Sequence, residues 1–146
     1  MSDYHTDFYT WTQTQAAALR AKDWAALDVA HLADDVAEFG QSIEHARESQ
    51  LERLLLHLLK LRYDPATRPR RGWRVTVRHA RHEIAKHVRR NPGLQHHPAQ
   101  VFADAYAFVR RLALDAMGVP PTTFPEACPW TLVQVLDEAF WPEEQP

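Results

Sequence analysis

The sequence predicts an all-α protein: a bundle of four main helices with a long central leucine-rich helix and a short C-terminal helix within a strap. Four glycines among 146 residues are too few for a fold built from many tight turns or hairpins. Alanine, leucine, arginine and glutamate, which favour helices, are plentiful. Because 45% of the residues are apolar, we expect one compact domain over residues 1–146, with frayed ends at 1–6 and 143–146.

The first helix is expected to begin after Asp7, a good N-cap residue, and to end near Lys22. Its apolar side chains fall close to one face at helical spacing, and these are Phe8, Trp11, Ala18 and Leu19. Asp23 and Asp28 are both candidate caps for the next helical segment. We therefore expect the residues between them to form a single turn or a hydrophobic clip.

A second helix is expected to start at Val29 and to run to Leu61, because its apolar positions keep helical phase across Gly40. One helix, straight or bent at Gly40, therefore fits the pattern better than two. About 33 residues at ~1.5 Å each would make it ~50 Å long, which exceeds the diameter of a compact domain of this size. Its first half must project, bend back or pack against another chain.

Residues 51–61 are apolar on nearly every side of this helix, so we expect them at the centre of the core. The leucines that create this pattern are Leu51, Leu54, Leu55, Leu56, Leu58, Leu59 and Leu61. Asp64 and Pro65 end the helix, because proline lacks the amide donor and disfavours an α conformation in the residue before it.

Two more main helices come next in the chain. The third is expected to start at Arg71 or Trp73 and to stop before residues 91–93, which read Asn-Pro-Gly. The side chains of its apolar face are Trp73, Val77, Ala80, Ile84 and Val88. The fourth helix is expected to run from about Pro98 to Met117, again with apolar residues at helical spacing.

The tail after the fourth helix is expected to form an ordered strap over the bundle. Gly118 favours the left-handed conformation of a C-cap. Thr131 and Gln134 have the spacing of a capping box for one short helix. The large apolar anchors of this strap are Phe124, Trp130, Phe140 and Trp141. By default we expect all five tryptophans of the chain to be core or strap anchors.

Basic residues are concentrated between Lys60 and Arg90. This window contains 11 of the 17 lysines and arginines of the chain and only two acidic residues. This window carries a formal charge of +9, and the rest of the chain carries −11. We favour pairing of these arginines with acidic faces of the first two helices, in the same chain or a second subunit. Binding of an anion or nucleic acid is the alternative, weakened because the whole chain is not basic and holds no nucleic-acid-binding motif. The candidate anion-binding residues are Arg68, Arg70, Arg71, Arg74, Arg78 and Arg81.

His57 lies within the leucine-rich helix on a polar strip that it shares with Arg53 and Lys60. Asp64 follows Lys60 by about one helical turn. Burial beside cations would lower the pKa of His57, whereas a neighbouring carboxylate would raise it. We interpret His57, Lys60 and Asp64 as polar residues at the edge of the core. No catalytic residue is predicted.

Histidines and carboxylates share helix faces at spacings of three or four, as the ligands of a bundle metal site do. The groups are His31 with Asp34, Asp35 and Glu38; His45 with Glu48 and Glu52; and His79 with His82, Glu83, Lys86 and His87. Nine scattered histidines produce such pairs by chance, so we predict no metal site and no cofactor. The single cysteine, Cys128, excludes an intramolecular disulfide and is expected to be a small buried hydrophobic residue.

Several segments in this order resemble domain-of-unknown-function family 29: DFYTWTQTQAAALR, LDVAHLADDVAEFGQS, LLLHLLKLRYDP, GWRVTV and FPEACPWTLVQVLDEAFWP. The resemblance covers nearly the whole chain and implies a small bacterial all-helical domain without an established activity, substrate or cofactor. The family pattern shows Gln, Arg and Glu around positions 79–82, where this chain has two histidines. Chemistry built on His79 and His82 would therefore be peculiar to this protein.

The expected function is a non-catalytic protein-interaction module that self-associates through the long second helix, as a homo-oligomer or with a protein partner. The alternative is an anion or nucleic-acid binder that uses the basic third helix and the Arg-rich turn before it. A metal-dependent enzyme is less favoured. We expect a cytoplasmic protein with no membrane partner, because the N-terminus lacks a signal-peptide pattern and residues 51–61 fall short of the ~20 needed to span a bilayer.

Overall fold

Helices make up every regular element of residues 3–144, the part of the chain that the computed structural model describes. The predicted all-α class is thereby confirmed. The chain divides into two compact units, Met1–Ile43 and Glu44–Pro146. The single domain expected from the sequence stays a prediction. No helix among residues 3–144 is both long enough and apolar enough to cross a bilayer.

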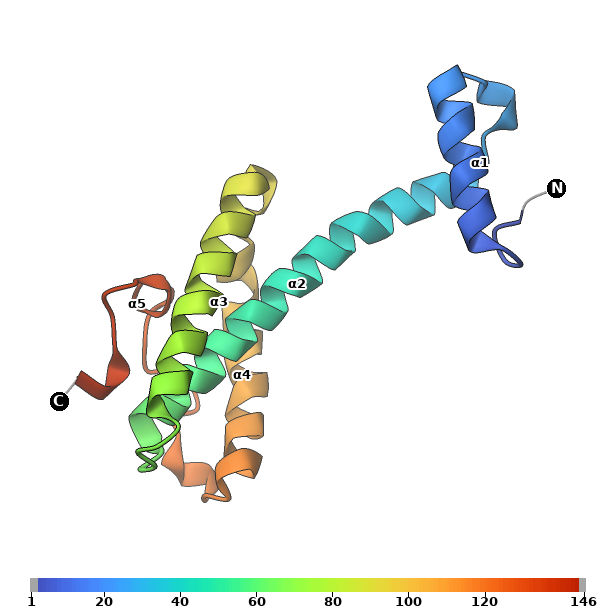
Figure 1. Ribbon diagram of the computed structural model, residues 1–146. Coiled ribbons are helices and arrows are strands. Elements are labelled where there is room, and N and C mark those ends of the chain that lie inside the picture. Colours follow the sequence, from blue (N-terminus) through green and yellow to red (C-terminus); the bar gives the residue numbers. More distant parts are fainter. Residues whose placement is uncertain (1–2, 145–146) are drawn as a thin grey trace. The chain divides into compact units, whose positions relative to one another are not determined.

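The first unit contains α1 (Phe8–Ala21), the short 3₁₀ helix η1 (Trp24–Ala26) and the beginning of α2 (Val29–Tyr63) (Figure 1). Asp7 caps α1 as predicted, because its carboxylate accepts the backbone N–H of Thr10 at 3.0 Å. Lys22 ends the helix in a left-handed conformation, with φ at 56°.

The long helix α2 is a single element of 35 residues, about 52 Å at 1.5 Å per residue. It passes Gly40 without interruption, so the prediction of one helix rather than two is confirmed. Its last residue, Tyr63, precedes Asp64 and Pro65, where the chain can no longer continue an α-helix. The helix begins in the first unit and ends in the second.

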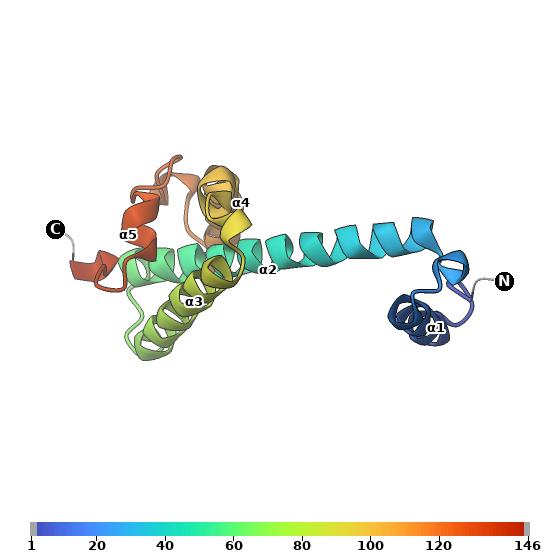
Figure 2. The ribbon, with the colours of Figure 1, turned by 90° about the horizontal axis from the view of Figure 1, so that it is seen from above.

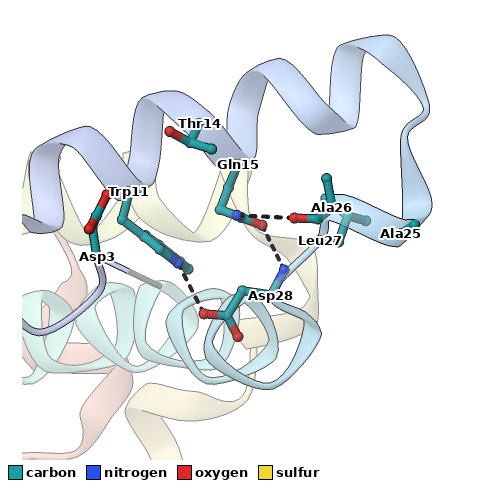
Figure 3. A pocket seen from close by; sticks show the side chains of 8 residues that line it. All are labelled: Asp3, Trp11, Thr14, Gln15, Ala25, Ala26, Leu27 and Asp28. Atoms are coloured by element: carbon teal, nitrogen blue, oxygen red, sulfur yellow. Dashed lines mark hydrogen bonds between the residues drawn. The ribbon is translucent and has the colours of Figure 1, made fainter. Parts of the chain in front are cut away.

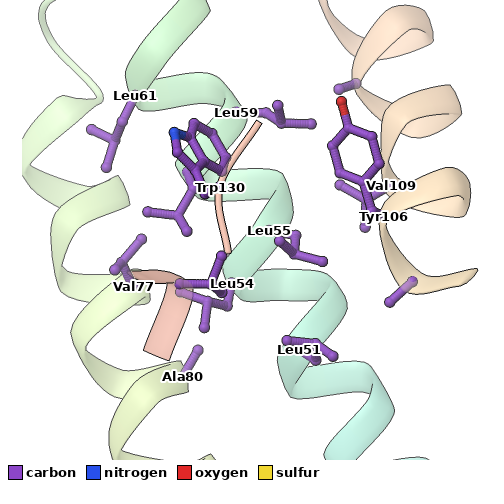
Figure 4. Close-up of a cluster of buried hydrophobic side chains, with 14 of the residues drawn as sticks. Leu51, Leu54, Leu55, Leu59, Leu61, Val77, Ala80, Tyr106, Val109 and Trp130 are labelled. Carbon is purple, nitrogen blue, oxygen red and sulfur yellow. The ribbon is translucent and has the colours of Figure 1, made fainter. Parts of the chain in front are cut away.

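The core of the second unit surrounds the leucines of α2, with α3 and α4 on different sides of them (Figure 2). The helices that join α2 here are α3 (Arg70–Arg90), η2 (Pro92–Leu94), α4 (His97–Met117), η3 (Pro121–Thr123), α5 (Leu132–Leu136) and η4 (Pro142–Glu144). Every predicted core leucine is buried except the half-buried Leu56. Figure 4 shows Val77 and Ala80 of α3 and Tyr106 and Val109 of α4 facing this leucine cluster.

The strap, defined here as residues 119–144, covers the second unit through four buried aromatic anchors. All four agree with the prediction, and they are Phe124, Trp130, Phe140 and Trp141. Thr131 and Gln134 form the predicted capping box at the start of α5. The hydroxyl of Tyr106 and the guanidinium of Arg110 both donate to the backbone carbonyl of Pro125, at 2.6 and 3.0 Å. Polar side chains thus hold the strap by its backbone as well as by its aromatic anchors.

Frayed ends were expected at residues 1–6 and 143–146, of which 1–2 and 145–146 lie outside the described residues. Two side chains within the expected ends make specific contacts. The hydroxyl of Tyr4 donates to the carboxylate of Asp35 at 2.9 Å, and Glu143 accepts a hydrogen bond from Arg70 at 2.9 Å.

Candidate functional site

A polar seam joins α1 to the start of α2 in the first unit (Figure 3). The indole N–H of Trp11 donates to a carboxylate oxygen of Asp28 at 3.1 Å, and the backbone N–H of Asp28 donates to the side-chain oxygen of Gln15 at 2.8 Å. The Gln15 amide also donates to the carbonyl of Ala26 at 3.4 Å. A pocket of about 400 Å³ lies beside these groups. Because its polar groups are already bonded to one another, the seam serves to hold the two helices together.

The segment before α1 adds a second contact to the same pair of helices. Tyr4 stacks on His31 with ring centroids 3.9 Å apart, and His31 Nδ1 lies 2.7 Å from a carboxylate oxygen of Asp28. The hydrogen bond to Asp35 raises the pKa of the Tyr4 hydroxyl. His31 and Asp35, which share a possible metal-binding face in the sequence, are therefore engaged in packing. Among residues 3–144, no group of three or more His, Cys, Asp or Glu side chains is placed to hold a metal ion.

An apolar groove of about 260 Å³ lies along the same two helices, and we call it the N-terminal groove. Its lining residues are Phe8, Trp11, Thr12, Gln15, Ala16, Leu19, Leu32, Asp35, Val36 and Phe39. Four of its large apolar side chains are exposed to solvent: Phe8 by 52%, Leu19 by 46%, Val36 by 67% and Phe39 by 72%. Among residues 3–43 the buried ones are Trp11, Gln15 and Ala18. The first unit therefore has an apolar face but almost no core.

Burial in this unit differs from the sequence prediction. Helical spacing placed Phe8, Leu19 and Val36 on the apolar faces, and these side chains are exposed because nothing among residues 3–43 covers that side of the two helices. Trp24, expected to be a core or strap anchor, is 63% exposed in η1. The periodicity identified the apolar faces correctly, but the unit contains too few elements to bury them.

Two of the six predicted anion-binding arginines are paired with a carboxylate of the strap. Arg70 donates to a carboxylate oxygen of Glu143 at 2.9 Å, and Arg74 forms an ion pair with the other oxygen. Arg70 also donates to the backbone carbonyl of Asp64 at 2.8 Å. The expected internal pairing therefore occurs, but its carboxylate comes from the C-terminal strap rather than from the acidic faces of the first two helices.

Three arginines of α3 surround the indole of Trp141. The guanidinium carbons of Arg74, Arg78 and Arg81 lie 4.0, 5.1 and 5.2 Å from its ring centroid, within the range of cation–π attraction. Arg81 is buried, whereas Arg78 is exposed. Arg68, before α3, and Arg71, in the first turn of α3, are exposed and make no hydrogen bond or ion pair with the residues that the structure describes. The six arginines thus divide by environment and do not form one surface.

The three predicted core-edge residues lie in separate environments. His57 Nδ1 is 2.7 Å from the backbone carbonyl of Arg53, and burial lowers the pKa of His57, with a smaller contribution from nearby Lys60. Lys60 lies over the ring of Trp73 at 5.8 Å, and Asp64 accepts the backbone N–H of Ala66 at 2.9 Å. The structure does not bring His57, Lys60 and Asp64 together, and each has a local packing role.

A buried arginine that the sequence reasoning missed lies in the middle of α2. Arg47 is fully buried, and one of its nitrogens donates to the carbonyl of Leu94 at 2.6 Å. Its helical phase with Leu51 and Leu54 was the available signal. Close by, His97 Nε2 lies 3.4 Å from a carboxylate oxygen of Glu48.

Cys128 is half-buried, and burial raises the pKa of its thiol. A raised pKa reduces the thiolate fraction, which is the reactive form of cysteine. This agrees with the expectation of an unreactive packing residue, although the side chain is less buried than predicted.

The comparisons with known proteins point to one family and report no activity. Neither the curated proteins nor the solved structures include a significant match. One family model, described as "Domain of unknown function DUF29", matches residues 4–141, which is nearly the whole chain. The protein therefore belongs to the DUF29 family, as the sequence resemblance predicted.

Proposed function

We propose that this protein is a non-catalytic protein-interaction module that self-associates through the N-terminal groove. The observation that carries the proposal is the set of four exposed apolar side chains in a 43-residue unit that has three buried residues among its described residues 3–43. Units of this size rarely bury enough surface to be stable alone and usually need a metal, disulfides or a partner. Large contiguous apolar patches on soluble proteins commonly mark interaction sites.

The chemistry of the groove favours a second copy of the same chain as its occupant. Asp35 is the single charged residue in the lining, and its carboxylate already accepts the hydroxyl of Tyr4. The centre of the groove can therefore meet an identical groove without placing bare like charges against each other. Two helix pairs that face each other in this way form a four-helix arrangement, and a two-fold dimer buries the same patch on both copies.

Sedimentation velocity of the full-length protein tests this proposal. We expect a concentration-dependent dimer and a large loss of dimer in Phe39→Asp, because burying an apolar side chain of this size stabilises by roughly 1.5–3 kcal/mol. Such a loss corresponds to a dissociation constant weaker by about tenfold to a hundredfold. The matched control is Val133→Asp, which adds the same charge at a 79% exposed position in the second unit.

Two outcomes would overturn the proposal. A wild-type protein that stays monomeric at millimolar concentration would exclude self-association. A dimer that Phe39→Asp and Val133→Asp weaken equally would place the contact elsewhere.

A further inference from the structure

A small cavity of about 120 Å³ lies between α3 and the strap, lined by Arg78, Arg81 and Glu138. Arg81 is only 3% exposed. Its Nε donates to the carbonyl of Val135 at 2.8 Å and its Nη2 to the carbonyl of Phe140 at 2.9 Å. The remaining nitrogen, Nη1, is buried and has no hydrogen-bond partner among the described residues. A buried guanidinium nitrogen without an acceptor is unusual in a folded protein.

The charge around this cavity is also incompletely balanced. Arg70 and Arg74 share the carboxylate of Glu143, but neither Arg78 nor Arg81 forms an ion pair with a described carboxylate. Burial lowers the pKa of Arg81 to about 10, with Asp137 opposing this effect from a distance. The cavity therefore places one buried and one exposed guanidinium group beside each other, with Glu138 as the single acid in its lining.

We propose that this cavity binds a phosphate-class oxyanion between the guanidinium groups of Arg78 and Arg81. Guanidinium groups donate several parallel hydrogen bonds and suit the oxygens of phosphate better than a point charge does. The anion would supply the acceptor that Nη1 of Arg81 lacks and would neutralise both arginines. A cavity of about 120 Å³ holds one phosphate group, either free or at the end of a larger molecule.

Arg78 and Glu138 are the positions at which the site can be changed without removing a hydrogen bond between described residues. Arg78 is exposed and its contact among the described residues is the face of Trp141, so Arg78→Ala is expected to fold. Arg81 bonds two carbonyls of the strap and is therefore not used as the test variant. Glu138 competes electrostatically with a bound anion, so Glu138→Gln is expected to strengthen binding. Arg71→Ala is the matched control, because Arg71 is exposed on the same helix without such a contact.

Isothermal titration calorimetry of the full-length protein with inorganic phosphate, at constant ionic strength held with sodium chloride, tests the site. Constant ionic strength keeps electrostatic screening the same at every phosphate concentration. We expect saturable binding of one phosphate per chain, about tenfold weaker in Arg78→Ala because a charge-assisted hydrogen bond is lost; tenfold corresponds to about 1.4 kcal/mol. Glu138→Gln is expected to bind severalfold tighter, and Arg71→Ala within about twofold of the wild type.

Parallel titrations define the ligand. Acetate at the same concentration should bind more weakly than phosphate. A phosphate monoester that binds as tightly as inorganic phosphate would show that the site accepts a phosphate group carried by a larger molecule. The absence of saturable binding up to about 50 mM phosphate would overturn the proposal, as would equal weakening in Arg78→Ala and Arg71→Ala. These results are independent of the oligomeric state, so they succeed or fail separately from the self-association proposal.

Discussion

The two halves of α2 share one helix and one apolar periodicity, yet they differ completely in burial. In the second unit, Leu54, Leu55 and Leu58 are fully buried between α3, α4 and the strap. In the first unit, Val36 and Phe39 remain exposed on a helix that has α1 as its main neighbour. An apolar stripe therefore identifies the face of a helix that is suited to burial. Whether that face is buried depends on how many other elements the same unit supplies.

The two units also differ in charge. Residues 1–43 contain two basic and seven acidic residues and carry −5, whereas residues 44–146 contain 15 basic and 12 acidic residues and carry +3. Two acids of the first unit accept hydrogen bonds within that unit: Asp7 from the backbone N–H of Thr10 and Asp28 from the indole N–H of Trp11. In the second unit, arginines bind backbone carbonyls of distant segments.

The largest expected effect is a difference in the stability lost when an apolar side chain is shortened in each half of α2. Leu58→Ala should lower the free energy of unfolding by about 2–5 kcal/mol, because it leaves a cavity in a closely packed core. Val36→Ala should change it by less than about 0.5 kcal/mol in the monomer. Urea unfolding followed by circular dichroism at low protein concentration measures both. Equal losses would contradict the contrast between the two halves.

A smaller effect is expected at the arginine that holds the strap. Arg81→Met removes the donor to the carbonyls of Val135 and Phe140, and leaving them unpaired should cost about 1–3 kcal/mol. Hydrogen exchange should show faster opening in residues 135–141, while residues 8–21 keep their wild-type protection. Arg78→Met is the control on the same helix, since Arg78 donates to no described carbonyl. Unchanged exchange in residues 135–141 of Arg81→Met would show that Arg81 does not help to hold this part of the strap.

The smallest expected effect concerns the salt dependence of the proposed dimer. Two first units that meet each carry −5, so chloride salts should screen their repulsion. Raising sodium chloride from 50 to 500 mM should therefore strengthen self-association a few-fold in sedimentation equilibrium. A dimer that weakens with salt would instead indicate contact between the acidic unit of one copy and the basic unit of another.

Local features of the fold were predictable because they depend on neighbouring residues. Asp7, Gly118 and the pair Thr131 and Gln134 mark helix ends where the structure has them, since a cap is made by side chains within one turn. The all-α class, the leucine core and the strap anchors were predictable from composition and periodicity.

Features that depend on distant contacts were not predictable in the same way. Arg74 pairs with Glu143, which lies 69 positions later in the chain, and no sequence pattern connects the two. Arg81, one of the predicted anion-binding residues, is buried by strap residues more than 50 positions away. The sequence therefore predicted six candidate anion-binding arginines on α3 and in the turn before it. The choice of Arg78 and Arg81 among these six required the structure.

Several arginines of the second unit bind backbone carbonyls, which has an evolutionary consequence. Arg47, Arg81 and Arg110 donate to the carbonyls of Leu94, Val135 and Pro125, among others. Every amino acid supplies a backbone carbonyl, so the residues that accept these bonds can mutate without losing them. The donors have no such freedom, because no other side chain offers the same fork of N–H groups. Selection should therefore conserve these three arginines more strictly than the residues whose carbonyls accept their hydrogen bonds.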